Sequence, residues 1–141
     1  MDILKAYDTI NWQFLLEILS LMGFPSMFIG WIRECVSTPR FSININGELV
    51  GFFGSSRGLR HGDSISSYLF VLVMEVLSML IRYKVEQSAS IGQPFQYHWR
   101  CNKTRITHLC FADDLMLFCS GSSQSAKVLH TALLEFSALL A

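Results

Sequence analysis

The sequence has little charge and no excess of either sign. Only 16% of its 141 residues are Asp, Glu, Lys or Arg, against about a quarter in an average globular chain. Eleven basic residues balance eleven acidic ones, whereas a self-contained nucleic-acid-binding module normally shows a basic excess. Hydrophobic residues make up 51% of the chain, which excludes intrinsic disorder. The composition therefore indicates either a membrane protein or the interior of something larger.

The sequence also lacks an apolar run of conventional membrane-spanning length. The most apolar stretch, from Tyr68 to Ile81, has 14 residues, and Glu75 lies in its middle. A spanning helix needs about 20 apolar residues. No signal peptide opens the chain, because Asp2 and Lys5 interrupt any apolar region. We interpret the stretch as a buried helix of a protein without a membrane partner, with Glu75 reaching an edge or pairing with a neighbour.

The cysteines form no C-x-x-C pair, and without a secretory signal we expect free, buried thiols. They are Cys35, Cys101, Cys110 and Cys119. A zinc site could be assembled from a mixed set, although its spacing matches no common zinc-finger pattern. That set is His98, Cys101, His108 and Cys110. The pattern favours packing in or beside strands over a metal function.

The hydrophobic periodicity predicts one α+β domain over residues 1–141. Apolar residues at helical spacing predict helices over residues 12–22, 25–35, 64–86 and 125–141, with Asn11 or Thr9 capping the first. Strands are predicted over residues 41–45, 49–53, 104–110 and 115–119, and residues 1–6 could end another. Asn46-Gly47 indicates a β-hairpin, because both turn positions need a positive φ. Residues 57–63 form a polar loop, and residues 87–97 look irregular.

Asp113 and Asp114 are adjacent carboxylates between two apolar strands. Ionising both is unfavourable without a nearby cation, and Mg²⁺ suits one or two carboxylates completed by water and phosphate oxygens. A solvated turn is the simpler alternative, since Asp is common in turns. Asp2, at the end of a possible neighbouring strand, would add a third carboxylate. Together the three would complete a two-metal site for phosphoryl or nucleotidyl transfer.

Four segments follow one another in a characteristic order. They read D-I-L-K-A-Y-D at residues 2–8, F-S-I-N-I-N-G at residues 41–47, R-G-L-R-H-G-D at residues 57–63 and F-A-D-D at residues 111–114. Over residues 2 to about 120 the chain resembles the reverse transcriptases of non-LTR, LINE-type retrotransposons, especially the plant versions. The resemblance implies a palm subdomain with an antiparallel ferredoxin-like sheet and helices on one face. It also implies RNA-directed DNA synthesis by a two-metal mechanism.

The resemblance implies a role for each matching residue. Asp2, Asp113 and Asp114 would be the catalytic residues and would bind Mg²⁺ or Mn²⁺. Tyr7 would be a steric gate that excludes the ribonucleotide 2′-hydroxyl, and Phe111 would help to place the primer end. The nucleotide pocket would be shaped by Arg60, His61, Gly62 and Asp63. From the residues alone, Tyr7 could also be a core side chain, and Arg57 and Arg60 could be plain loop charges.

Departures from the family pattern accompany the match. The family usually has Gln where this chain has His61, and Pro where Ser64 and Ser67 stand, which loosens the start of the following helix. The implied partners are an RNA template, a DNA primer and deoxynucleoside triphosphates, and the implied location is nuclear. Fingers and thumb segments are expected to be missing, so the fragment should be inactive alone and need those segments or another chain. The alternative is a non-enzymatic remnant serving as a scaffold or interaction module, or a translated pseudogene.

Overall fold

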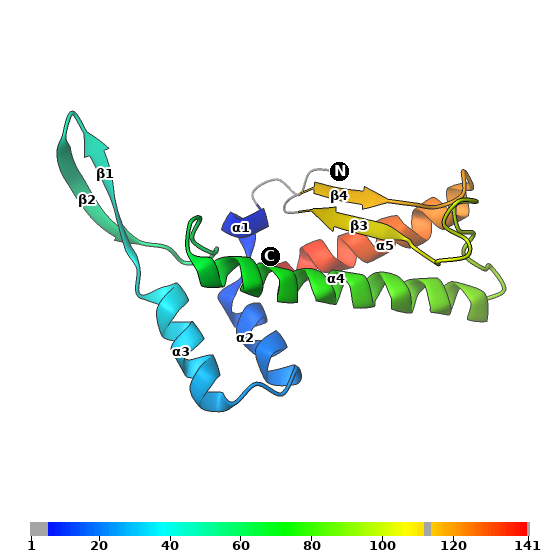
Figure 1. Cartoon of the computed structure of the whole chain (residues 1–141), viewed down its shortest axis with the longest axis horizontal. Coiled ribbons are helices and arrows are strands. Elements are labelled where there is room, and N and C mark those ends of the chain that lie inside the picture. Colours follow the sequence, from blue (N-terminus) through cyan, green and yellow to red (C-terminus); the bar gives the residue numbers. More distant parts are fainter. Residues whose placement is uncertain (1–5, 112–113, 141) are drawn as a thin grey trace. The chain divides into compact units, whose positions relative to one another are not determined.

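The computed structural model describes residues 6–111 and 114–140, which contain both helices and strands, as predicted (Figure 1). These residues divide into two compact units, an N-terminal unit over Tyr7–Phe70 and a C-terminal unit from Val71 onward. The elements are α1 (Ala6–Thr9), α2 (Trp12–Leu21), α3 (Ser26–Ser37), β1 (Arg40–Ile45), β2 (Glu48–Gly54), α4 (Ser64–Ser90), β3 (His108–Phe111), β4 (Asp114–Leu117) and α5 (Ser123–Leu140).

The N-terminal unit is built around α2. The Asn11 Oδ1 atom accepts hydrogen bonds from the backbone N–H groups of Gln13 (2.9 Å) and Phe14 (3.2 Å). These bonds satisfy donors that a helix start leaves without partners. Of the two predicted caps, the structure therefore confirms Asn11. The buried face of α2 consists of Leu15, Ile18 and Leu19, at the spacing of an amphipathic helix.

The hairpin of β1 and β2 confirms the prediction from Asn46-Gly47. The two turn residues have φ values of 53° and 92°, and the strands pair antiparallel. Ile43 lies opposite Val50 and Phe41 lies opposite Phe53, so these four side chains share one face. All four are at least 36% exposed. The hairpin therefore owes its structure to local turn chemistry and strand pairing rather than to burial.

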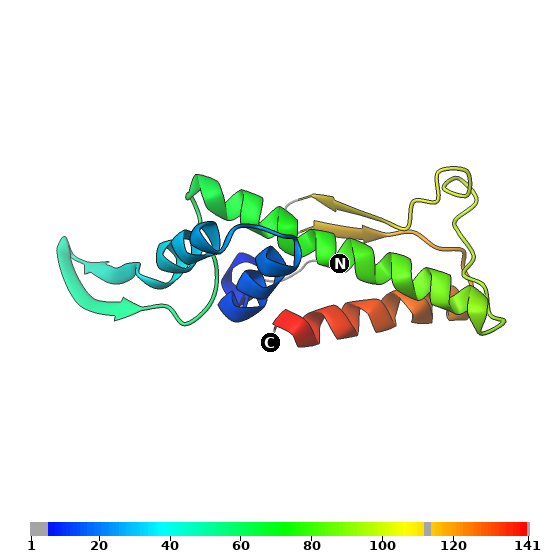
Figure 2. The ribbon, with the colours of Figure 1, turned by 90° about the horizontal axis from the view of Figure 1, so that it is seen from below.

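The C-terminal unit combines most of α4 with α5 and the β3–β4 hairpin. Both views show α5 running alongside α4 (Figure 1 and Figure 2), and the Lys84 Nζ atom lies 2.6 Å from the Glu135 Oε1 atom. In β3–β4, His108 pairs with Leu117 and Phe111 pairs with Asp114. The core is formed by Val73, Met74, Leu77, Ile81, Phe95, Leu115, Leu129, Ala132 and Phe136.

Two predicted boundaries differ from the structure by more than two residues. Helix α4 continues to Ser90, four residues beyond the predicted end, because no helix breaker occurs before Gly92 (φ 73°). The strand predicted over residues 104–110 begins only at His108. Arg105 has a φ of 52°, which is incompatible with an extended strand. In both cases the backbone conformation of one residue decides where the element ends or begins.

The structure contains both helices and strands, but the predicted ferredoxin-like arrangement of the sheet stays a prediction. In the part of the chain that the structure describes, the strands form two separate two-stranded antiparallel sheets. The predicted additional strand over residues 1–6 falls almost entirely outside the described residues. A ferredoxin-like palm sheet with helices on one face is thus consistent with β3–β4, α4 and α5 but not demonstrated by them.

Helix α4 is long and apolar enough, by length and composition alone, to cross a membrane, and among the described residues it is the one such helix. The core helix of a soluble protein meets the same criterion. Its residues Leu69, Val73, Leu77 and Ile81 are at most 4% exposed and recur on one face. Glu75 is exposed, so it reaches an edge, as predicted. The buried stripe supports the interpretation of α4 as a core helix.

The prediction of buried thiols was wrong. All four cysteines are free, but Cys35 and Cys110 are exposed, and Cys101 and Cys119 are half-buried. Cys110 belongs to the hairpin strand β3, and strands of a two-stranded sheet leave one face open to solvent. Composition predicts that Cys is often buried but not which face of a strand a given Cys occupies.

His108 is expected to make the C-terminal unit sensitive to acid. Its pKa is lowered from 6.5, chiefly because burial penalises the charged ring; Glu75 partly opposes this shift and Arg82 adds to it. The unfolded chain therefore binds a proton more readily than the folded one, so stability is lost as pH falls through 6.5 and below. Urea unfolding at pH 7.5 and at pH 5.0 measures how much stability is lost on acidification, and this loss should be smaller in His108→Gln than in the unmodified chain. Replacing exposed His130 by Gln should leave the loss of stability between the two pH values as it is in the unmodified chain. An equal reduction of this loss in both variants would contradict the role of His108.

Candidate active site

Three hydrogen bonds join the segment around α1 to the loop before α4. The backbone N–H of Leu59 donates to the Tyr7 carbonyl (2.7 Å), and that of Gly58 donates to the Ile10 carbonyl (2.8 Å). The Trp12 indole Nε1–H donates to the Gly58 carbonyl at 2.7 Å. Two motifs about 50 residues apart in sequence, the first and third of the four segments, are thus held together. Two of the three bonds join backbone groups, and the third depends on the Trp12 side chain.

Gly58 is the point of closest approach between the two segments. Its φ is +89°, a conformation that L side chains rarely adopt. A Cβ atom at this position would lie 2.9 Å from the carbonyl oxygen of Asp8 and 3.0 Å from its Cα atom. Both atoms belong to the backbone and cannot rotate away. Gly58 is therefore required by conformation and by space.

Tyr7 lies between two other rings. Its ring stacks on Phe70 with centroids 4.6 Å apart and planes 14° apart, and the His61 ring is tilted at 5.0 Å. Phe70 is buried and Tyr7 is half-buried, so the tyrosine is supported from one side while part of it faces solvent. Offset or stacked aromatic pairs add about 0.5–1.5 kcal/mol beyond area burial. This geometry holds the Tyr7 ring in one orientation.

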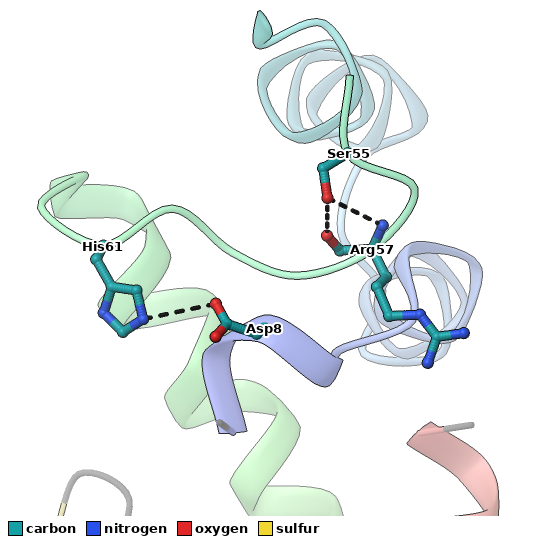
Figure 3. Close-up of polar contacts among 4 residues, drawn as sticks. All are labelled: Asp8, Ser55, Arg57 and His61. Carbon is teal, nitrogen blue, oxygen red and sulfur yellow. Dashed lines mark hydrogen bonds and ion pairs between the residues drawn. The ribbon is translucent and has the colours of Figure 1, made fainter. Parts of the chain in front are cut away.

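Asp8 and His61 approach each other across the loop (Figure 3). The His61 Nε2 atom lies 3.7 Å from the Asp8 Oδ1 atom, and both side chains are more than half exposed. At that distance and exposure the contact is an ion pair only while His61 is protonated, and it contributes little to stability. In the same view, the Ser55 hydroxyl donates to the Arg57 carbonyl. Asp8 of α1 thus presents a carboxylate to solvent, and the loop presents the imidazole of His61 and the guanidinium of Arg57.

A cavity of about 470 Å³ opens between these segments. Its volume falls in the range of small-ligand sites, about 300–1,000 Å³. The guanidinium of Arg60 lies 5.9 Å from the centre of the Phe41 ring, within the range of a cation–π contact. The lining residues are Asp8, Trp12, Val36, Phe41, Ser55, Arg57, Gly58, Leu59, Arg60 and His61. The cavity therefore combines an apolar wall with a polar, mostly cationic rim.

Asp63 caps α4 rather than facing the cavity. Its Oδ1 atom accepts a hydrogen bond from the Ile65 N–H (3.3 Å), and its carbonyl accepts one from the Ser66 N–H (3.1 Å). Gly62 precedes it with a φ of +85° and open space where a Cβ would stand. Of the four residues predicted to shape a nucleotide pocket, the structure thus places Arg60 and His61 on the cavity wall, and Gly62 and Asp63 in the turn that starts α4.

The predicted carboxylate site lies only partly within the described residues. Asp114 begins β4 and is exposed, and its partner Phe111 is 84% exposed. Asp2 and Asp113 lie outside the described residues. Among the residues that the structure does describe, no three His, Cys, Asp or Glu side chains cluster as metal ligands. The alternative zinc set is therefore not assembled, and the three-carboxylate site stays a prediction.

Some residues of this region were not predicted. Asp8 lies within the first motif quoted above, and Phe70 lies in the helix predicted over residues 64–86. Periodicity gives no sign that Asp8 contacts His61 or that Phe70 contacts Tyr7. The sequence pattern predicts Trp12 as an apolar residue at the start of a helix but does not predict that its indole N–H donates a hydrogen bond to the loop. Gly58 could have been singled out, because a glycine inside a polar loop often marks a positive φ.

Comparisons with known proteins identify the family that the chain resembles in sequence. The family model described as reverse transcriptase (RNA-dependent DNA polymerase) matches residues 1–140. The chain is 49% identical over 70 residues to an uncharacterised mitochondrial protein of Arabidopsis thaliana, which covers 50% of this chain and 54% of the relative. It is 27% identical over 141 residues to the Pol polyprotein of the type-2 retrotransposable element R2DM of Drosophila melanogaster, covering 99% of this chain and 12% of the polyprotein.

A further relative is the 149 kDa protein of transposon TX1 of Xenopus laevis, 27% identical over 117 residues, which is 83% of this chain and 8% of the relative. The chain thus spans about half of the Arabidopsis relative and a small part of the two transposon proteins. These relatives confirm the resemblance to non-LTR retrotransposon proteins. Because the family model covers nearly every residue, the chain belongs to the reverse transcriptase (RNA-dependent DNA polymerase) family.

Proposed function

We propose that this chain supplies the catalytic centre of a retrotransposon RNA-directed DNA polymerase. In that reaction a primer 3′-hydroxyl attacks the α-phosphate of a deoxynucleoside triphosphate paired to an RNA template, and pyrophosphate leaves. The observation that carries the proposal is the cavity of about 470 Å³ that the Tyr7–Trp12 segment and the Arg57–His61 loop enclose. It lies in a chain whose family model covers residues 1–140.

Asp2, Asp113 and Asp114 are proposed to hold the divalent ions. Carboxylate oxygens are the ligands that Mg²⁺ prefers, with water and phosphate oxygens completing its shell. Asp114 is exposed at the start of β4, so its carboxylate is open to such ligands. When bound, the ions would activate the attacking hydroxyl and stabilise the leaving phosphate. Phe111, also exposed and paired with Asp114, is proposed to support the primer end.

The cavity is proposed to receive the incoming nucleotide. Arg60 and His61 are exposed on its wall and offer donors to phosphate oxygens. The Tyr7 ring, held by Phe70, is proposed to fill the space that a ribose 2′-hydroxyl would need. The backbone turn at Gly62 and Asp63 is proposed to position this wall by fixing the start of α4. In this proposal the cavity wall binds the phosphates, the turn before α4 orients that wall, and Tyr7 excludes the ribose 2′-hydroxyl.

Residues 1–141 by themselves are proposed to be inactive or nearly so. Catalysis of nucleotidyl transfer depends on holding the reacting groups in line, which supplies much of the rate. A chain with equal numbers of acidic and basic residues has little general attraction for the phosphate backbone. Activity should therefore be tested within a longer polypeptide.

The test is a chimera of the Drosophila polyprotein in which this chain replaces the matched segment, with the unmodified polyprotein as reference. We expect the chimera to extend a DNA primer on an RNA template with deoxynucleoside triphosphates and Mg²⁺. Extension should depend on the template sequence. A soluble, folded chimera that extends no primer would contradict the proposed function, and so would extension without a template.

Replacing Tyr7 by Ala in the chimera should weaken discrimination against ribonucleotides. Without the ring, the 2′-hydroxyl is no longer excluded, and we expect the ratio of kcat/KM values for deoxy- over ribonucleotides to fall on the order of tenfold or more. Tyr7→Phe keeps the ring and its stack on Phe70, so it should keep the ratio. Because the ratio is internal to each variant, loss of stability alone would leave it unchanged. An unchanged ratio in Tyr7→Ala would show that Tyr7 is only a packing residue.

A further inference from the structure

A second cavity lies in the C-terminal unit, at the end of β3 where His108 stands. It has a volume of about 390 Å³. One wall comes from the second half of α4, and the other comes from the segment that leads into β3. The polar side chains on its walls include Ser78, Arg82, Glu86, Tyr97, Arg105 and His108. Nothing in the proposed polymerase chemistry uses this cavity.

The two arginines of the cavity have no anionic partner among the described residues. Arg82 and Arg105 are exposed, and the ion pairs that the described residues form are His61–Asp8 and Lys84–Glu135. Glu86 is the one carboxylate on the cavity wall. Between Glu86 and Asp113 the sequence contains no Asp or Glu. The cavity therefore offers two free guanidinium groups, which bind phosphate oxygens well.

Hydroxyl groups line the cavity beside the arginines. The Ser78 Oγ atom lies 2.9 Å from the His108 Nε2 atom and also donates to the Met74 carbonyl at 3.2 Å. The Thr107 Oγ1 atom lies 3.0 Å from the His108 Nδ1 atom. With the Ser78 proton directed to Met74, Nε2 donates to Ser78 and Thr107 donates to Nδ1. The imidazole is thus held neutral and fixed, and it leaves the arginines as the cationic groups of the wall.

An exposed aromatic platform belongs to the same segment. Trp99 is 74% exposed, and the Arg100 guanidinium lies 4.6 Å from the centre of its ring. The centre of the His98 ring lies 5.7 Å from the centre of the Trp99 ring. A cation over one face orients the indole and leaves it available for stacking. Lys103 is also exposed in this segment. Aromatic rings interleaved with basic groups are the pattern by which proteins bind single-stranded nucleic acid.

The backbone of this segment is strained at Arg105. Its φ of 52° is uncommon for a residue other than glycine. Such a conformation persists only when its surroundings hold it. Here it accompanies the placement of the Arg105 side chain on the cavity wall. The strained residue and the unpaired arginine are the same residue.

We propose that the cavity and Trp99 form a second contact for single-stranded RNA, separate from the nucleotide cavity. A phosphodiester group binds between Arg82 and Arg105, and a neighbouring base stacks on Trp99. That the strand is RNA rests on the proposed function, in which the template is RNA. One wall of the cavity and the platform belong to the same segment, because Tyr97 and Arg105 line the cavity and Trp99 lies between them in the sequence. This contact gives a chain of zero net charge a local site for the template backbone.

The test measures binding of a fluorescently labelled, unstructured RNA oligonucleotide to the full 141-residue chain by anisotropy. Trp99→Ala should weaken binding about tenfold, the typical loss of one base–aromatic stack, whereas Trp99→Phe should retain most of the affinity. The double variant Arg82→Ala/Arg105→Ala should reduce the slope of log affinity against log salt by about 0.7, the contribution of the one phosphate contact that the two arginines share.

Two matched variants control for general effects. Trp31 is 61% exposed on α3, and Arg33 is exposed on the same helix. Trp31→Ala and Arg33→Ala should bind RNA as the unmodified chain does. Equal losses in control and test variants, or no loss in Trp99→Ala and in the double arginine variant, would overturn the proposal. Inorganic phosphate is the competitor. If it displaces all bound RNA at a concentration equal to that of the RNA, the cavity is a site for a free anion only and the proposal is overturned.

The two proposals fail in different ways. If the chimera lacks template-dependent extension but RNA binding still requires Trp99, the proposed function falls and the RNA contact stands. If the chimera extends primers while Trp99→Ala leaves RNA binding unchanged, the proposed function stands and the RNA contact falls.

Discussion

Replacing Asp113 by Asn in the chimera is expected to abolish primer extension. Asparagine keeps the size of the side chain but removes the negative charge that the divalent ions require. Electrostatic groups placed where charge develops in the transition state account for losses on the order of 100- to 1,000-fold when one is removed. Because a carboxylate that holds the ions affects every step through them, we expect the upper end of this range. The measurement is the single-turnover rate of extension at saturating Mg²⁺.

A matched acidic residue controls for this experiment. Glu48 is exposed at the start of β2, and Glu48→Gln removes one charge without touching the proposed site. It should extend primers at the reference rate, and Asp2→Asn should behave like Asp113→Asn. Extension by Asp113→Asn within a few fold of the reference rate would show that this carboxylate is a solvated turn residue, the simpler of the two alternatives that the dipeptide allows.

Gly58→Ala is expected to be the most destabilising single substitution in the N-terminal unit's loop. The new methyl group would meet the Asp8 backbone at 2.9–3.1 Å while the residue keeps a φ of +89°. A left-handed conformation costs a non-glycine residue roughly 1–2 kcal/mol, and overpacking typically adds about 1–3 kcal/mol. We therefore expect the free energy of unfolding to fall by about 3 kcal/mol. Urea denaturation followed by far-UV circular dichroism measures this change.

Gly62→Ala separates the two causes. Gly62 has nearly the same φ, +85°, but nothing lies within 4 Å of its hypothetical Cβ. Only the conformational cost of about 1–2 kcal/mol should remain. If the two variants lose equal stability, the close approach between Gly58 and Asp8 does not hold the loop. Since the same approach shapes the cavity wall, Gly58→Ala should also weaken nucleotide binding in the chimera more than Gly62→Ala does.

Features set by a few neighbouring residues could be predicted from the sequence. The β1–β2 hairpin follows from Asn46-Gly47, because the need for two positive φ values is local. The start of α2 follows from Asn11, because a capping bond spans only two or three residues. The start of β3 was misplaced, because a positive φ at Arg105 has no sequence signature comparable to glycine. The end of α4 was misplaced because the helix continues until shortly before Gly92.

Features that depend on residues distant in sequence could not be predicted in this way. The stack of Tyr7 on Phe70 joins residues 63 positions apart, and the bond from Trp12 to Gly58 spans 46. Motif resemblance placed Arg60 and His61 in a nucleotide pocket, and both line the cavity. It also assigned Asp63 to that pocket, and the hydrogen bond from the Ile65 N–H to the Asp63 Oδ1 atom places Asp63 at the start of α4. A motif identifies which residues matter together but not which of them carries the local structure.

The central claim is that Asp2, Asp113 and Asp114 share divalent ions in this chain. Mn²⁺ broadens the NMR signals of nuclei near its binding site, so titrating it into the isotopically labelled 141-residue chain tests the claim without requiring turnover. The account predicts that the amide signals of residues 2–4 and 111–115 broaden first, and that Asp113→Asn removes this effect. Broadening confined to other carboxylates, or unchanged in Asp113→Asn, would contradict it.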